Sequence, residues 1–515
     1  MKKIFLGILS LYMAISLIAC NVNDKNDNSN KIVDKKDEFS FTFLKLENEE
    51  KNKIYSPLSI KYALKMLERG AVGKSKEQIF RVIGDIELTK YESNNNMSLA
   101  NSLFIRDTFK SEIEKTYINA LKKEYNAEII FDSFANPDNV NSWISDKTLK
   151  LINNLVDDVS MNDFILINAL GIDMKWENHF LAKDFKGKMY QHENFYCEYL
   201  DEVTPKKFGK QNEKIAGMEI VAAINNYDIV NELGDDEIRK VVGKKFREWA
   251  KTLEMRDWQV NYFDKDLSDE NIEKKLKEFL NGSEKLGSKG YIAEIDSNYG
   301  KVDFSTQFSL HVDDDIKVFA KDLKEYNGTT LQYVGIMPIK EKLDKYILNI
   351  NDEKIDNIIA NLKDLKSENF KEGVVTKITG YIPKFKFEYE LKLKEDLKQL
   401  GIVNVFEEGK AELTEICKND DMFITEAKHK ANIEFTEDGI KAAAVTSLIG
   451  SLSSVGGGIF DYSFDVPVEE IDLTFDKPYM FLIRDKKTEE IWFVGTVYEP
   501  LLWENEPEKD LQGAT

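Results

Sequence analysis

The chain has 515 residues and a formal net charge of −21. This length exceeds one ordinary domain, and a composition of 42% hydrophobic and 11% aromatic residues excludes a disordered chain. The acidic balance argues against a general nucleic-acid-binding protein, which would carry a basic patch. The composition therefore predicts folded domains and no nucleic-acid partner, but it identifies no partner by itself.

The first 38 residues predict an exported and tethered protein. A basic start is followed by an apolar run, Ile4–Ala19, which is shorter than a typical transmembrane helix. Residues 1–19 are therefore expected to be a signal peptide. The sequence Leu-Ile-Ala-Cys that ends at Cys20 resembles the lipobox of bacterial lipoproteins. The resemblance implies that Cys20 is lipidated and anchors the protein at the cell envelope or cell surface, with residues 20–38 as a flexible tether. An ordinary signal peptide or an uncleaved anchor is the alternative.

The first folded elements follow residue 39. Ser56 and Pro57 form an N-terminal helix signal, and the apolar residues behind them recur at helical spacing: Ile60, Ala63, Leu64 and Leu67. Phe164–Trp176 is an apolar run typical of a buried strand. Residues 204–299 are rich in Lys and Glu with a helical period, which predicts an inserted helical segment that packs on the body or recruits a partner.

Strand patterns return after residue 300, at Leu331–Pro338, Ile378–Leu391 and Ala431–Asp438. Near the C-terminus, two apolar strands around Asp485–Glu490 predict a hairpin, followed by a tail at 504–515. The mixture of helices and antiparallel strands indicates an α+β fold.

The sequence shows no enzymatic motif. Its four histidines lack metal-ligand spacing, and the common nucleophile, zinc-protease, phosphate-loop and dinucleotide motifs are absent. Once Cys20 is lipidated, only Cys197 and Cys417 remain, which are too few for a disulfide framework and are expected to be buried free thiols. We therefore expect no catalytic residue, no cofactor and no metal site.

One stretch, Thr436–Phe460, is unusually small and uncharged for such a charged chain. No Lys or Arg occurs from Ala442 to Asp476. If the stretch is a strand, one face carries Ile440, Ala442, Ala444, Thr446 and Leu448, without any charge. The segment could therefore exist as a loop or enter a sheet as a strand, and a plain flexible linker is the alternative.

Eight blocks of the chain, in the right order, resemble the serpin family. They are Asn52–Ile79, Ala100–Ile105, Val140–Thr148, Ile167–Trp176, Tyr326–Pro338, Tyr381–Ile402, Lys428–Thr446 and Lys477–Pro500. The resemblance implies a metastable serpin-like fold of helices around three β-sheets with an exposed reactive-centre loop, 437–476. The serpin domain would comprise 39–203 and 300–503, and the segment 204–299 has no serpin counterpart.

The resemblance also implies a function that is not enzymatic. A serpin is a suicide inhibitor of serine, or alternatively cysteine, endopeptidases. The protease attacks the loop and becomes acylated, and the cut loop then inserts into the main sheet and distorts the acyl-enzyme. We expect a monomer whose partner is a target endopeptidase, and a non-inhibitory surface binding protein with a serpin fold is the alternative.

Site residues transfer from the family at matching positions. The hinge comprises Glu437, Asp438, Gly439 and Ile440, followed by Ala442, Ala443, Ala444, Val445 and Thr446. A polar cluster beneath the opening sheet, the shutter, matches Ser56, Ser59, Asn168 and His429. The point of first insertion, the breach, matches Trp176, Lys384 and Glu437, of which Lys384 and Glu437 could form an ion pair.

The loop departs from the family in length and at Ile440, where inhibitory serpins usually have Thr or Ser. Counting forward from the hinge places the scissile bond between Ser453 and Ser454, and counting back from Pro478 places it near Val466. Between these limits, the side chains that suit elastase-, chymotrypsin- or subtilisin-like pockets are Leu452, Phe460, Tyr462 and Phe464. A trypsin-like pocket requires a basic side chain, so trypsin-like targets are disfavoured.

Overall fold

The computed structural model describes residues 39–177, 190–192, 195–198, 206–209, 213–226, 307–418, 422–436, 439–440 and 467–503, with isolated positions between 240 and 274. The signal peptide, Cys20 and the tether therefore lie outside the described residues, as do the helical stripes expected within 227–299. No helix in the described ranges is long and apolar enough to cross a membrane.

The helices in the described ranges are short, and most of them lie in the first and last thirds of the chain. They are α1 (Phe39–Leu46), α2 (Pro57–Glu68), α3 (Gly73–Ile83), α4 (Lys115–Tyr125), α5 (Asp138–Lys147), α9 (Leu343–Leu348), α10 (Asp352–Ala360) and α11 (Leu393–Gln399), with 3-10 turns η1 (Asp107–Phe109), η5 (Ser367–Asn369) and η6 (Asn404–Phe406). Helix α2 begins as expected. The Ser56 hydroxyl accepts a hydrogen bond from the Ser59 amide at 3.0 Å, and Pro57 occupies the first turn, where it needs no backbone partner.

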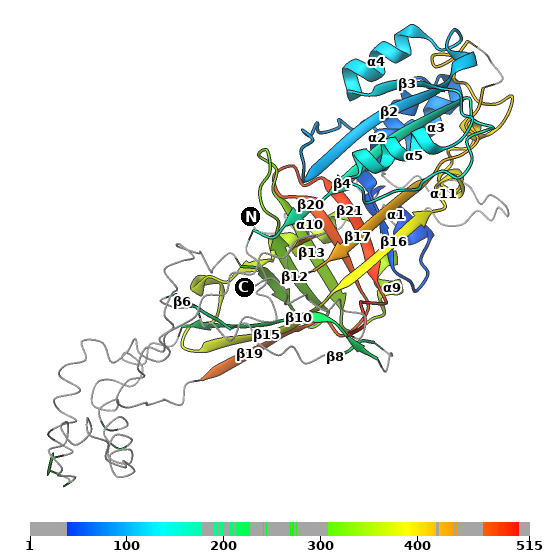
Figure 1. Ribbon diagram of the computed structural model, residues 1–515. Coiled ribbons are helices and arrows are strands. Elements are labelled where there is room, and N and C mark those ends of the chain that lie inside the picture. Colours follow the sequence, from blue (N-terminus) through cyan, green and yellow to red (C-terminus); the bar gives the residue numbers. More distant parts are fainter. Residues whose placement is uncertain are drawn as a thin grey trace, which may run out of the picture. The chain divides into compact units, whose positions relative to one another are not determined.

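A seven-stranded sheet carries the most deeply buried strands. Its order is β1 (Lys53–Tyr55), β21 (Ile491–Val497), β20 (Tyr479–Asp485), β13 (Leu331–Pro338), β12 (Ile316–Asp322), β11 (Ser309–Val312) and β14 (Lys363–Asp364). Every residue of β13, β20 and β21 is buried, because both faces of the sheet are covered at these strands. The strand at Leu331–Pro338 and the C-terminal hairpin are confirmed (Figure 1).

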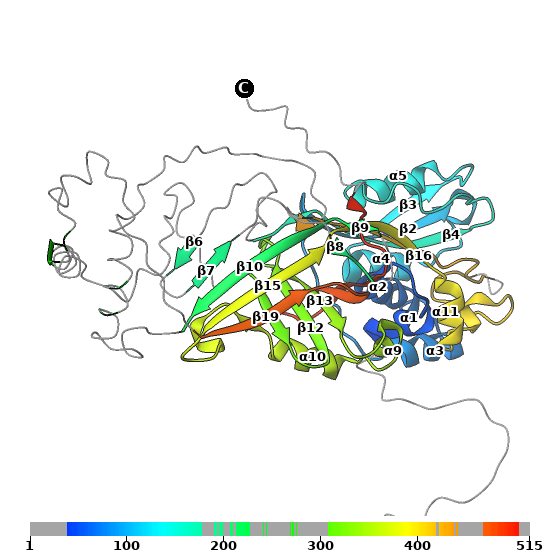
Figure 2. The same cartoon turned by 90° about the horizontal axis from the view of Figure 1, so that it is seen from below.

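A five-stranded sheet corrects one prediction. Its order is β19 (Val468–Thr474), β15 (Val375–Pro383), β10 (Gly217–Asn225), β7 (Phe195–Glu198) and β6 (Tyr190–His192), and β8 (Lys206–Lys207) pairs with β9 (Lys214–Ile215) beside it. The described start of the predicted helical insertion thus contains strands β8, β9 and β10, and β10 pairs with β15 along its whole length (Figure 2). Ile220, Ala222 and Ile224 alternate with other residues and are buried, so the local period here is that of a strand.

The apolar pattern at Ile378–Leu391 also divides between two sheets. Strand β15 ends at Pro383, and β16 (Phe385–Leu391) begins two residues later in a different sheet. Between them, the Lys384 amide donates to the carbonyl of Ala216 at 3.0 Å, and the Lys384 carbonyl accepts from the Leu501 amide at 2.8 Å. These bonds to neighbouring chain segments hold the bend where the chain changes sheets.

The third layer consists of two sheets that share one chain segment. One contains β3 (Glu128–Asp132), β2 (Met97–Arg106) and β4 (Phe164–Ile172), and the other contains β16, β17 (His429–Phe435), β18 (Gly439–Ile440) and β5 (Met174–Lys175). Only Asp173 separates β4 from β5, so the expected strand Phe164–Trp176 is present with one break. This layer is the main sheet of the expected fold, and it is interrupted between β4 and β17.

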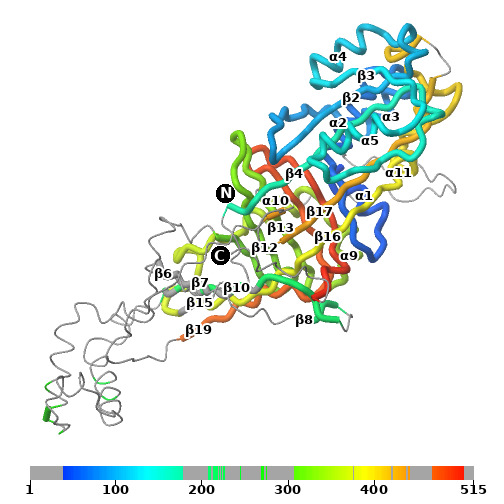
Figure 3. Tube along the Cα trace, in the orientation of Figure 1, coloured from blue at the N-terminus to red at the C-terminus, as the bar shows by residue number. Residues whose placement is uncertain are grey.

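Segments distant in sequence form the core beneath this layer. In Figure 3 the helices α1 and α2, coloured blue, lie beside β21, coloured red. The buried side chains Ile60, Leu64 and Leu67 of α2 belong to one apolar cluster with Leu482 and Val494 of the hairpin. Helix α2 is therefore held in the core by the hairpin, and the interrupted sheet packs against it.

A pair of buried carboxyl groups joins the end of α1 to α11. The Glu47 carboxylate accepts hydrogen bonds from the Lys392 amide, at 2.9 Å, and from the Tyr389 hydroxyl. Asp396 is 2% exposed, and burial, followed by the charge of Glu47 and their mutual hydrogen bond, raises the pKa of Asp396 to about 7. The fold therefore holds Asp396 as a neutral acid below neutral pH.

We expect this pair to make the fold less stable in mild alkali. The pKa of Asp396 is higher in the folded state than its unfolded value of 3.8. The contribution of Asp396 to the free energy of unfolding is therefore fully present below pH 3.8, and it is lost as the pH rises through about 7. The loss between pH 6 and pH 8 is about 1 kcal/mol. Thermal melts at both values should show it as a difference: relative to Asp396→Asn, in which the other titrating groups are unchanged, the wild type should lose this amount of stability. The control Glu408→Gln removes an exposed carboxylate that does not contribute to this pKa shift, and it should keep the wild-type dependence.

Candidate functional site

The candidate site is the interruption between β4 and β17. Strand β4 is hydrogen-bonded to β2 along its whole length, and β17 is hydrogen-bonded to β16 in the same way. Within the described residues, no pairing joins β4 to β17, and β17 meets another strand on this side only where Phe435 pairs with Ile440. Among the described residues, two strand edges therefore face each other without strand pairing along most of their length.

A cavity of about 380 Å³ occupies the space between these edges. Its walls are residues 164–170 of β4 and residues 429–431 of β17. Helix α2, the chain at 152–163 that follows α5, and the chain at 422–428 that precedes β17 form its other sides. We call this space the gap. Its lining combines apolar side chains with the polar cluster described below.

The hinge closes one end of the gap, which we call its upper end whatever the orientation of the figures. Gly439 and Ile440 form β18, in which Gly439 pairs with Lys175 and Ile440 pairs with both Met174 and Phe435. Ile440 is 2% exposed, and a Cβ atom on Gly439 would lie 2.2 Å from the carbonyl oxygen of Met174. Glycine is therefore required for the close approach of the hinge to β5, and the first hinge residues are already seated in the sheet.

Trp176 supports the seated hinge. Its side chain is fully buried, and its indole N–H donates to the carbonyl of Thr436 at 2.9 Å. The ring makes edge contacts with Phe435 and Tyr333, at centroid distances of 5.4 and 6.2 Å. Trp176 thus lies at the upper end of the gap, where the breach was predicted. Lys384 lies at the bend between β15 and β16, and Glu437 is outside the described residues, so their predicted ion pair stays a prediction.

The structure brings the four predicted shutter residues together at the gap. The Ser56 amide donates to His429 Nε2 at 3.0 Å, and the Ser59 hydroxyl donates to the Asn168 carbonyl at 3.5 Å. Ser56 and Ser59 are in turn joined by the N-cap bond of α2. The cluster therefore connects α2 to β4 on one side and to β17 on the other.

Asn101 is a member of this cluster that the sequence did not suggest. The Asn168 side-chain amide donates to Asn101 Oδ1 at 2.8 Å, and Asn101 donates to the carbonyl of Tyr125 at 2.8 Å. Asn101 is opposite Asn168 in the pairing of β2 with β4. Only this register could have identified it, since nothing in the sequence around Asn101 distinguishes it from another polar strand residue.

His429 is held in its neutral form. Part of its surface faces the gap rather than bulk water, and burial lowers the pKa of its imidazole to about 4. Because Nε2 accepts a hydrogen bond from the Ser56 amide, this nitrogen carries no proton. Protonation of Nε2 would remove the bond that connects β17 to the start of α2.

The remaining predicted residues lie outside the described chain. They are Asp438, Ala442, Ala443, Ala444, Val445, Thr446, Leu452, Ser453, Ser454, Phe460, Tyr462 and Phe464. The side chain of Cys197 is also outside the description, whereas Cys417 is buried, as expected. Among the described side chains, no three His, Cys, Asp or Glu residues gather as a metal site would require.

Comparisons with known proteins identify the family. The family model described as "Serpin (serine protease inhibitor)" matches residues 34–204 and 305–500, which is more than half of the chain. Serpin B4 of Homo sapiens is 23% identical, covering 88% of this chain and 95% of that protein, and the leukocyte elastase inhibitor of Xenopus tropicalis is 22% identical, covering 90% and 97%. The two parts of the match bracket the segment that the sequence marked as an insertion.

Solved structures show the same fold. Native tengpin, a thermophilic serpin, has a TM-score of 0.56 at 19% identity and covers 93% of this chain and 96% of its own. The thyroxine-binding globulin complex with thyroxine has a TM-score of 0.55 at 16% identity, with coverage of 90% and 98%. Helices around a layered set of sheets, with the hinge seated beside an interrupted main sheet and a family match on both sides of the insertion, place this chain in the serpin family.

Proposed function

We propose that this protein inhibits serine, or alternatively cysteine, endopeptidases by trapping the acyl-enzyme through loop insertion. The observation that carries the proposal is the position of the hinge in the sheet, at one end of a gap between two strand edges that no other described strand pairs along most of their length. Strand β18 runs antiparallel to both β5 and β17, so a strand that continues from Ile440 can add hydrogen bonds on both sides. The small residues Ala442–Ala444 would be the next to enter.

The chemistry of the first step belongs to the protease. Its nucleophile attacks the carbonyl carbon of the scissile residue, the peptide bond breaks, and the new amine leaves with a proton supplied by the protease. The inhibitor contributes the free energy gained when the cut strand fills the gap. The bound protease is then displaced and distorted before water can hydrolyse the ester that a serine nucleophile forms, or the thioester that a cysteine forms.

The composition of the loop supports one class of target. The absence of Lys and Arg from Ala442 to Asp476 leaves Leu452, Phe460, Tyr462 and Phe464 as the residues that fit a protease pocket. These suit elastase-, chymotrypsin- and subtilisin-like enzymes. The similarity to a leukocyte elastase inhibitor supports an elastase-like target, at 22% identity.

A non-inhibitory binding protein is the second candidate. Ile440, at a position where inhibitory serpins usually have Thr or Ser, and the structural similarity to a thyroxine-binding globulin favour it. In that case the gap would not fill rapidly after cleavage. For either function, the motif that ends at Cys20 supports a lipid anchor at the cell envelope or surface, as a further part of the proposal.

Incubation with four proteases tests the proposal. Elastase, chymotrypsin or subtilisin should give a covalent complex that survives denaturant, whereas trypsin should give none. The same enzymes with their nucleophilic serine blocked beforehand are the control and should give no complex. Cleavage within 442–466 without a complex, and without a rise in the thermal midpoint of the cleaved protein, would support the binding protein instead. Mass spectrometry of the cleaved chain identifies the scissile bond.

A further inference from the structure

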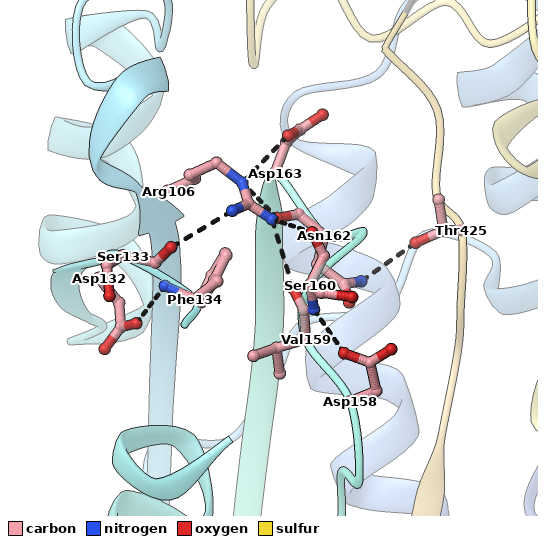
Figure 4. Close-up of polar contacts among 10 residues, drawn as sticks. All are labelled: Arg106, Asp132, Ser133, Phe134, Asp158, Val159, Ser160, Asn162, Asp163 and Thr425. Carbon is pink, nitrogen blue, oxygen red and sulfur yellow. Dashed lines mark hydrogen bonds and ion pairs between the residues drawn. The ribbon is translucent and has the colours of Figure 1, made fainter. Parts of the chain in front are cut away.

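A side-chain hydrogen bond closes the end of the gap opposite to the hinge, which we call its lower end. Asn162 lies just before β4 and Thr425 lies just before β17, and the Asn162 side-chain amide donates to the Thr425 hydroxyl at 3.1 Å (Figure 4). The bond joins residues that are 263 positions apart in sequence. Both residues line the gap and are half-buried. The two chain segments that lead into the facing strands are thus connected at this point.

The Asn162 side of this bond is held by Arg106, the last residue of β2. The Arg106 guanidinium donates to the carbonyls of Asn162 and Ser160, each at 2.6 Å, and more distantly to the carbonyl of Val159. Its Nε lies 3.5 Å from the Asp163 carboxylate, and the Arg106 amide donates to the Asp163 carbonyl at 2.8 Å. Arg106 therefore fixes the turn before β4, as Figure 4 shows.

The Thr425 side is held independently. Lys394 of α11 donates to the Thr425 carbonyl at 2.6 Å. Because both backbones are already fixed, the bond between Asn162 and Thr425 orders only two short side chains, and its entropic cost is small. Such a bond between fixed segments resists their separation more effectively than a bond between two free surface side chains.

The register of the hinge shows where an inserting strand would meet this bond. Continuing the pairing of Ile440 with Met174 places Leu452 opposite Asn162. Continuing the pairing of Ile440 with Phe435 places Gly450 opposite Thr425. The two extrapolations are independent and agree within two residues. A strand can therefore fill the gap as far as Leu448 while the bond is intact, but Gly450–Leu452 can enter only after it breaks.

We propose that the Asn162–Thr425 hydrogen bond, here called the lower latch, controls the last step of strand insertion. Insertion would proceed from the hinge downward, pause above the latch, and finish when Asn162 and Thr425 separate. The inference rests on the proposed function, because a strand must insert for the latch to matter. The latch residues are positioning residues: they touch neither the protease nor the scissile bond, and they set how fast the strand reaches its final position.

Peptide uptake by the full-length protein tests the latch without any protease. One synthetic peptide has the sequence Lys441–Leu448, which ends above the latch, and the other has the sequence Lys441–Ser453, which must pass it. The rate of uptake is followed by native gel and by the rise in thermal midpoint. Thr425→Val removes the hydroxyl at nearly constant shape and should speed uptake of the longer peptide about fivefold, the factor expected for one hydrogen bond.

Matched variants separate the latch from a general loosening of the sheet. Thr425→Ser retains the hydroxyl and should behave as the wild type, whereas Asn162→Ala should match Thr425→Val. The double variant Asn162→Ala with Thr425→Val should be no faster than either single variant. Uptake of the shorter peptide should be the same in all of them.

The outcomes are distinct. Equal uptake of the longer peptide by wild type, Thr425→Val and Asn162→Ala would overturn the latch and leave the proposed function standing. Equal acceleration of both peptides would also overturn it, because the effect would not be confined to the lower end. If the wild type takes up neither peptide, the gap does not accept a strand, and the proposed function fails together with the latch.

Discussion

Replacing Ile440 by Asp is expected to release the hinge from the sheet. Ile440 is buried between Met174 and Phe435, and a carboxylate at this position would be removed from water. Burying an unpaired charge costs several kcal/mol. This cost exceeds the stabilisation that the hydrogen bonds of a two-residue strand provide. The hinge should therefore leave the sheet, and the hydrogen bond between Trp176 and the Thr436 carbonyl should be weakened.

Two measurements check the release of the hinge. Hydrogen exchange at Gly439 and Ile440 should become fast, and trypsin should cut after Lys441, which is followed by no other base before Lys477. The conservative variant Ile440→Val should keep slow exchange and resist trypsin like the wild type. Unchanged exchange in Ile440→Asp would mean that the two strand pairs of β18 hold the hinge without help from the side chain.

Mild acid is expected to weaken the connection between α2 and β17. The pKa of His429 is about 4 in the folded state, below its unfolded value of 6.5, so the folded state binds fewer protons than the unfolded state between these values. Its stabilisation is present above about pH 6.5 and is lost as the pH falls toward 4. Between pH 7.5 and pH 5 the loss is up to about 2 kcal/mol.

Urea unfolding at the two pH values measures this loss by difference. His429→Gln keeps an acceptor for the Ser56 amide and removes the titration, so its midpoint should change less between pH 7.5 and pH 5 than that of the wild type. Contributions from other groups, Asp396 among them, are common to both proteins and cancel. A parallel shift in wild type and His429→Gln would contradict the assignment.

Much of the fold could be predicted because local signals agreed with the final packing. The Ser56 cap, the fully apolar strand at Leu331–Pro338 and the C-terminal hairpin each carry their own pattern, and each is present. The prediction for 204–299 was wrong at its beginning because the average composition of a long segment hid a short strand, Gly217–Asn225, in front of the Lys/Glu-rich part. The division at Lys384 depends on bonds to Ala216 and Leu501, which no local pattern reports.

The site was predictable only in part, for a similar reason. The shutter residues and Trp176 came from resemblance to a family, and the structure places them around one gap. Asn101, Asn162 and Thr425 are ordinary polar residues in sequence, and their importance comes from the pairing partners that the topology gives them. The loop residues after Lys441 lie outside the described chain. The position of the scissile bond therefore rests on the sequence alone, where counting from the two ends of the loop gives two different positions.

The seating of Ile440 changes how insertion should depend on time. A process that adds one residue at a time to a growing element is slow to begin. Its first contacts fix several dihedral angles for few hydrogen bonds, whereas each later step adds a bond for each residue fixed and is fast. In this protein β18 is already paired on both sides, so the nucleus exists before cleavage. Ile440 is already buried in the sheet and does not have to enter it during insertion. Insertion after cleavage should consequently begin without a lag, and its overall rate should be governed by propagation down the gap.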